Sequence, residues 1–85
     1  MRNQHNWKVV TEEGAKREVR AVKFGGIWRI QSKLKKDNDW TYHDPPLLTD
    51  LVELRDVLFR KYQRRRAAYE DVVLIEKMIE ERNGE

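Results

Sequence analysis

Apolar and polar residues alternate along residues 18–34, as they do in β-strands that bury one face. Gly25-Gly26 interrupts this alternation, and glycine tolerates the positive φ angles that a two-residue hairpin turn requires. A hairpin with this turn pairs Phe24 with Ile27 and sorts the side chains by face. One face collects Val19, Ala21, Trp28, Ile30 and Leu34. The other collects Glu18, Arg20, Arg29, Gln31 and Lys33. A slip of one residue would mix the two sets, so the pattern predicts this register.

An earlier strand is predicted from about Trp7 to Thr11, joined to the hairpin by residues 12–16. A five-residue connection of this kind places Trp7 opposite Ala21. Val9 then lies opposite Val19, so the earlier strand adds two apolar side chains to the apolar face.

A short fourth strand is predicted at 40–43, after the turn-forming residues 36–39. It has two possible registers. One puts Trp40 and Tyr42 in the core, and the other puts them beside Lys33 and Gln31 on the polar face.

From Leu47 onward, apolar residues recur every three or four positions, which is the period of an α-helix. They are Leu51, Leu54, Leu58, Tyr62, Val72, Ile75 and Ile79. No glycine or proline interrupts residues 50–82, so both one helix and two remain open. A single helix would be about 50 Å long, more than the roughly 30 Å of a compact chain of this size. Such a helix would have to protrude or pack against another chain.

These elements predict an α+β fold, in which a three- or four-stranded antiparallel sheet packs on a long or broken C-terminal helix. Trp28 and Ile30 are expected in the core, against Leu51, Leu54 and Leu58. The sequence Asp44-Pro45-Pro46 separates a strand half, residues 6–44, from a helical half, residues 47–82, because proline disfavours helix. With 85 residues, we expect a single domain, 1–85.

Composition excludes several classes of protein. The chain has no cysteine, which excludes a disulfide scaffold and a thiolate metal site. No apolar run approaches the roughly 20 residues of a membrane span. Residues 1–8 carry no apolar signal region. We therefore expect a cytoplasmic protein with no membrane partner.

Catalytic and cofactor-binding motifs are weak. Tyr42-His43-Asp44 is the one grouping that resembles a catalytic set, but neighbouring residues of a strand point to opposite faces. The Gly25-Gly26 turn lacks the spacing of phosphate-binding glycine loops. Two histidines without cysteine also argue against a metal site. We therefore expect no enzyme, no cofactor and no metal.

Charge is unevenly spread, although the net charge is only +3. Residues 1–44 hold ten basic and six acidic residues, and residues 45–66 hold six basic and three acidic ones. Residues 67–85 hold two basic and six acidic residues. The chain thus has a basic body and an acidic tail, which the small net charge hides.

Two groups of residues are candidates for binding nucleic acid. The polar sheet face offers Arg20, Arg29, Gln31 and Lys33, and the helical half offers Arg60, Lys61, Arg64 and Arg65. Basic groups neutralise phosphates, and glutamine can read base edges. For the first group, plain solvation of a wet sheet face is the favoured explanation. The second group could equally pair with the acidic stretch 70–81, in an antiparallel dimer or a hairpin, or could serve solubility alone.

The order of strands followed by a helix resembles, in architecture, sheet-based DNA-binding modules such as the amino-terminal domains of some phage-type integrases. We expect a small non-enzymatic binding module whose ligand is DNA or RNA. The alternative is a protein-interaction or self-assembly domain. In that alternative, Val72, Ile75 and Ile79 form the interface of a homodimer or of a complex with another protein.

Overall fold

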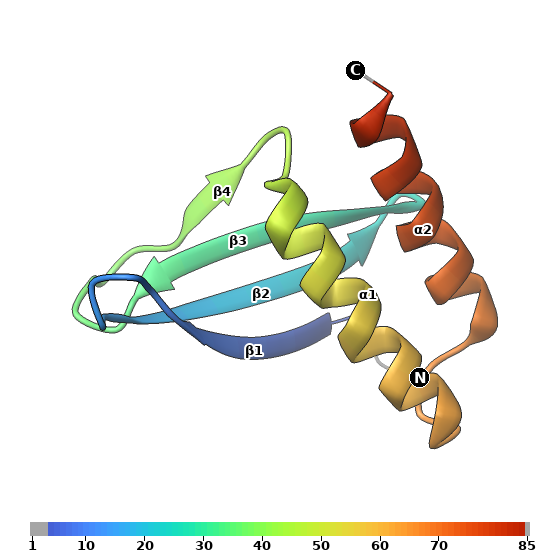
Figure 1. Cartoon of the computed structure of the whole chain (residues 1–85), viewed down its shortest axis with the longest axis horizontal. Helices are drawn as coiled ribbons and strands as arrows, with labels where there is room; N and C mark the ends of the chain where they lie inside the picture. The colour runs from blue at the N-terminus through green and yellow to red at the C-terminus, as the bar shows by residue number, and fades with distance from the viewer. Residues whose placement is uncertain (1–3, 85) are drawn as a thin grey trace. The chain divides into compact units, whose positions relative to one another are not determined.

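Figure 1 shows a computed structural model of the chain, which describes residues 4–84. It contains a four-stranded antiparallel sheet and two helices, so the α+β prediction is confirmed. The elements are β1 (Gln4–Val10), β2 (Lys16–Phe24), β3 (Ile27–Leu34), β4 (Thr41–His43), α1 (Leu48–Gln63) and α2 (Tyr69–Asn83). Backbone contacts divide the chain into a sheet unit that ends at Pro46 and a helical unit that begins at Leu47. The expectation that residues 1–85 form a single domain stays a prediction.

The sheet has the order β1-β2-β3-β4, so each strand pairs with the next one along the chain. Gly25 and Gly26 connect β2 to β3 with φ angles of 61° and 79°. Positive φ at both positions defines the type I′ turn, whose twist matches that of the strands. Phe24 pairs with Ile27, and the whole predicted β2–β3 register is confirmed.

The register of β1 differs from the prediction by two residues, because Trp7 lies opposite Val19 and not opposite Ala21. Thr11 explains the difference, since it belongs to the turn and not to the strand. Its backbone N–H donates to the Ala15 carbonyl at 2.8 Å, and its hydroxyl oxygen accepts from the Ala15 N–H at 3.1 Å. A shift of two residues in the pairing of β1 with β2 keeps every side chain on its predicted face.

The short strand β4 adopts the second of its two predicted registers, with Tyr42 opposite Gln31. Tyr42 is therefore on the same face as the polar residues of β2 and β3. His43 points to the opposite face, where its Nε2 and the Ser32 hydroxyl lie 2.6 Å apart in a hydrogen bond.

The inner face of the sheet is defined by Val19, Ala21, Trp28 and Ile30 and by the residues that alternate in step with them. These four side chains are almost completely inaccessible to solvent, as predicted. His5 is also buried there, with its ring 5.5 Å from that of Trp28. The expected contact of this face with the leucines of α1 stays a prediction.

The expected long or broken C-terminal helix is wrong, because residues 48–83 form two separate helices. Arg65 ends α1 by adopting the left-handed conformation, with φ at 60°. The N–H of Arg66 donates to the Lys61 carbonyl at 2.6 Å, and the N–H of Arg65 donates to the Tyr62 carbonyl at 2.9 Å. These two bonds form a Schellman motif, which satisfies the last carbonyls of α1 and stops the helix.

The two helices contact each other and bury the same pattern of residues. In each helix an aspartate at the third position is buried, followed by three aliphatic side chains at identical spacing. The buried sets are Asp50, Leu51, Leu54 and Leu58 in α1, and Asp71, Val72, Ile75 and Ile79 in α2. Acidic residues in a first turn are favoured by the helix dipole, and the aliphatic spacing follows the helical period.

Replacing Trp28 with alanine is expected to lower the free energy of unfolding by about 3 to 5 kcal/mol, because its side chain is fully buried. Urea denaturation followed by circular dichroism measures this loss. Val10→Ala is the control, since Val10 is 68% exposed and its truncation should have little effect. A loss below about 1 kcal/mol for Trp28→Ala would show that this ring does not belong to the core.

Arg65→Gly is expected to stabilise the protein by roughly 0.5 to 1 kcal/mol, because glycine relieves the cost of the left-handed conformation. Arg64→Gly removes the same charge, but Arg64 has a φ of −93°, so glycine should destabilise there by about 0.5 to 1 kcal/mol. Thermal unfolding of the two variants gives opposite signs if α1 ends here. Equal destabilisation by both would indicate a continuous helix.

Candidate nucleic-acid interface

The outer face of the sheet, opposite to the inner face, gathers positive charge. Strand pairing places all four predicted sheet residues, Arg20, Arg29, Gln31 and Lys33, on this face. The register of β1 and β4 adds Lys8 and Tyr42. On β1 to β3 the outward charged side chains are five basic ones and one acidic one. They are Lys8, Lys16, Arg20, Arg29 and Lys33, against Glu18.

Arg20, Gln31 and Trp40 form a fixed group at the centre of this face. The Arg20 Nε and Nη2 atoms donate to the Gln31 Oε1 atom at 3.0 and 2.6 Å. The guanidinium carbon of Arg20 lies 4.1 Å from the centroid of the Trp40 ring, within the range of a cation–π contact. Hydrogen bonds and stacking together hold the Arg20 and Gln31 side chains in one orientation.

The single outward acid is neutralised by a neighbour. The Nζ atom of Lys33 lies 3.6 Å from the Oε2 atom of Glu18 and 5.6 Å from the Trp40 ring centroid. Lys8, Lys16 and Arg29 have no ion pair with any residue in 4–84. The outer face therefore keeps an excess of unneutralised cations.

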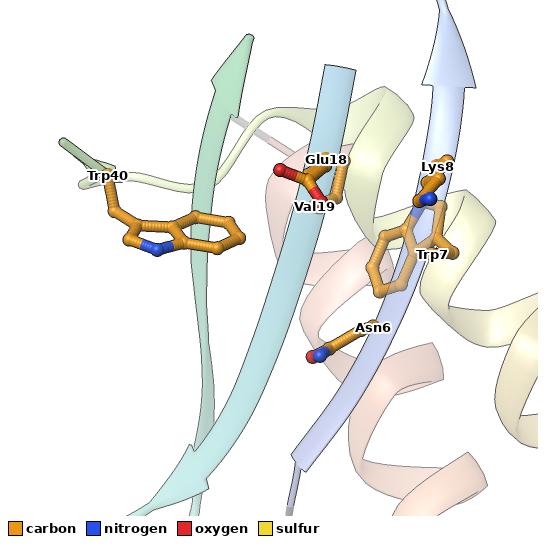
Figure 2. Close-up of a pocket in the computed structure, with 6 residues that line it drawn as sticks. All are labelled: Asn6, Trp7, Lys8, Glu18, Val19 and Trp40. Carbon is orange, nitrogen blue, oxygen red and sulfur yellow. The ribbon is translucent and has the colours of Figure 1, made fainter. Parts of the chain in front are cut away.

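Two of the hollows on the sheet unit border the outer face, and Trp40 borders the first of them, the Trp40 hollow (Figure 2). Its volume is about 340 Å³. Figure 2 shows the Trp40 ring reaching over β3 toward β2, with Asn6 and Lys8 projecting from β1. The lining residues are Asn6, Trp7, Lys8, Glu18, Val19 and Trp40.

The second, the aromatic hollow, lies toward the hairpin turn and has a volume of about 380 Å³. It is lined by Val22, Phe24, Arg29, Gln31 and Tyr42. Phe24 is 64% exposed and Tyr42 is 46% exposed. The guanidinium carbon of Arg29 lies 5.1 Å from the Phe24 ring centroid. Two exposed aromatic rings, a cation and an amide thus converge on one depression.

The predicted helical residues lie in the other unit, around the end of α1. Arg60 and Lys61 belong to its last turn, and Arg64 and Arg65 follow in the turn that ends the helix. Arg60, Arg64, Arg65 and Arg66 make no ion pair with the residues described, so the acidic stretch of α2 does not neutralise them within the chain.

Three exposed aromatic rings from the end of α1 and the start of α2 lie next to one another, and the sequence pattern did not single them out as a surface. The Tyr62 ring centroid lies 6.4 Å from that of Phe59 and 5.4 Å from that of Tyr69. Tyr62 follows the apolar period of the helix, which suggested a core position, yet it is 39% exposed. Phe59 lies beside the buried Leu58 on the helix and could have been recognised as an outward-facing aromatic.

The residues predicted for a protein interface are placed differently. Val72, Ile75 and Ile79 are 2%, 0% and 7% exposed, so all three are already covered in the folded chain. A partner could reach them only by displacing elements of the structure. Their assignment to an interface stays a prediction.

A second arrangement, missed in the sequence, joins Ser32 and His43 on the inner face. Besides the bond to Ser32, His43 Nε2 lies 3.5 Å from Arg17 Nη2. The sequence could not reveal this group, because only the register of β4, which pairs His43 with Ile30, brings its ring beside Ser32 and Arg17. Ser32 is 5% exposed, so its hydroxyl holds the strands together and does not face a substrate.

Within residues 4–84 no group of three or more metal-ligating side chains is found, and neither helix is long and apolar enough to cross a membrane. No protein-family model, curated protein or solved structure matches the chain. The function therefore has to be inferred from the chemistry of the outer face.

Proposed function

We propose that this protein is a non-enzymatic module that binds nucleic acid through the outer face of its sheet. One observation carries the proposal. Five outward basic side chains and only one outward acid share this face with two exposed aromatic rings, Phe24 and Tyr42.

Each part of this surface matches one part of a nucleic acid. Lysine and arginine neutralise the phosphates, and this electrostatic attraction supplies most of the affinity of sequence-independent binding. Exposed aromatic rings stack on bases. The exposed cluster of Arg60, Arg64 and Arg65, with Lys61 beside it, offers a further cationic patch for the phosphate backbone.

The double variant Arg29→Ala/Lys33→Ala is expected to weaken binding roughly tenfold at low salt, because it removes two phosphate-binding cations. The logarithm of the binding constant should also depend less on the logarithm of salt concentration, by about 1.4 to 1.8 in slope. Fluorescence anisotropy of a labelled oligonucleotide, repeated across a salt series, measures both quantities.

Lys35→Ala/Lys36→Ala is the matched control, because these exposed lysines lie beyond the end of β3 and their loss changes the net charge equally. It should leave the slope close to that of the unmodified protein. Equal effects of the two double variants would show that net charge, and not the outer face, drives binding. If no DNA or RNA binds at low salt and micromolar protein, the proposal fails.

A second candidate function is self-assembly through the helical unit. Phe59, Tyr62 and Tyr69 form a contiguous exposed aromatic cluster, and exposed apolar clusters commonly mark interfaces. The neighbouring arginines and the exposed acids of α2, such as Glu76 and Glu80, have no ion pairs among residues 4–84. A second antiparallel copy would bring these opposite charges together, and apolar burial would supply most of the stability.

Sedimentation equilibrium at tens of micromolar tests this candidate. Self-assembly predicts a dimer, and Phe59→Asp should convert this dimer to a monomer because the new charge would lie in the apolar contact. Phe24→Asp is the control, since it places the same charge on an exposed phenylalanine of the sheet unit. A monomer throughout the concentration range would eliminate self-assembly.

A further inference from the structure

The aromatic hollow has the chemistry of a site for one flat ring with a polar edge. Its volume of about 380 Å³ lies at the small end of the range of about 300 to 1,000 Å³ found for small-molecule sites. The exposed rings of Phe24 and Tyr42 supply apolar surface, and Arg29 and Gln31 supply polar groups.

Gln31 lines this hollow and has a hydrogen-bond donor available. Arginine carries only donors, so the atom of Gln31 that faces Arg20 must be the amide oxygen, at 2.6 and 3.0 Å. The amide nitrogen is therefore turned elsewhere, and it donates to no residue in the described part of the chain. A ligand with a carbonyl oxygen at its edge can accept from this nitrogen.

Arg29 can bind a phosphate while it remains stacked. Its guanidinium lies over the Phe24 ring, and stacking uses the flat face and leaves the N–H groups at the edge available. Arg29 is exposed and has no ion pair with any residue in 4–84. A stacking ring, a donor and a free cation within one depression are the three elements that a nucleotide requires.

A duplex does not fit this arrangement. In a duplex the faces of the bases are stacked on one another, so a ring can enter the hollow only when it is unpaired. Four strands spaced about 4.8 Å apart also span roughly 14 Å before side chains are added, whereas the major groove of B-DNA is about 12 Å wide. The outer face is therefore suited to carry a single strand along its surface.

We infer that the ligand is a single-stranded nucleic acid, and that the aromatic hollow takes one unstacked base beside Phe24 and Tyr42. The Gln31 amide nitrogen donates to an acceptor at the edge of that base, a carbonyl oxygen or a ring nitrogen, and so orients the base in the hollow. This inference rests on the proposed function of the outer face.

Fluorescence anisotropy at about 50 mM salt compares three labelled ligands: oligothymidine, oligoadenosine and a mixed-sequence duplex, each of about 12 nucleotides or base pairs. Oligothymidine and oligoadenosine should each bind at least about tenfold more tightly than the duplex. Gln31→Met should lower the affinity for both single strands, because it removes the donor that orients the base.

Two variants isolate stacking from charge. Phe24→Leu and Tyr42→Leu should each lower the affinity for oligothymidine by about 5- to 100-fold without changing the slope against salt, because no phosphate contact is lost. Val73→Ala is the control, since it removes exposed apolar surface from the helical unit and should leave binding unchanged. Circular dichroism confirms that each variant is folded.

The outcomes separate this inference from the proposed function. If the duplex binds as tightly as oligothymidine, and Phe24→Leu and Tyr42→Leu have no effect, the single-strand inference is overturned. The proposed function then still stands, provided that Arg29→Ala/Lys33→Ala reduces binding. If none of the three ligands binds, and single-stranded and duplex RNA do not bind either, the proposed function fails, and the inference fails with it.

Discussion

The two-residue turn at Gly25-Gly26 is the constraint on which the rest of the sheet depends, because it fixes the register between β2 and β3. In this register Ala21 and Ile30 are buried, while Arg20 and Gln31 meet on the outer face. A slip of one residue would bury the guanidinium and expose the aliphatic side chains, at a large desolvation cost. The same register therefore builds the core and gathers the cations, so the proposed binding surface is a direct consequence of how the sheet folds.

Much of the sheet unit could be predicted from the sequence, because alternation and glycine turns are local signals. The sequence did not predict the strand register where that register depended on a single side chain. Thr11 hydrogen-bonds to Ala15 and is withdrawn from β1, which shifts the pairing by two residues. Trp40 joins the outer face because its ring contacts Arg20 and Lys33. The alternation pattern left both registers of β4 open, since an aromatic side chain suits a core and a cation–π contact equally.

The helical unit was harder to predict. Residues 64–68 are all good helix formers, so the composition does not predict a helix end there. Arg65 nevertheless ends α1 by adopting the left-handed conformation, which glycine usually adopts. The candidate binding residues of the sheet were found because they share a face by alternation. The sequence predicted only part of the aromatic hollow, because the position of Tyr42 depends on the register of β4. The depression itself depends on side-chain packing, which periodicity does not describe.

The most direct test of the account is nuclear magnetic resonance of the labelled protein during a titration with oligothymidine. The account predicts that the side-chain amide of Gln31 and the backbone amides around Phe24, Arg29 and Tyr42 shift progressively and saturate together. Amides on the exposed side of α2, around Val73, should keep their positions. Saturable shifts confined to the helical unit, or no shifts at any residue, would contradict the claim that the outer face of the sheet binds nucleic acid.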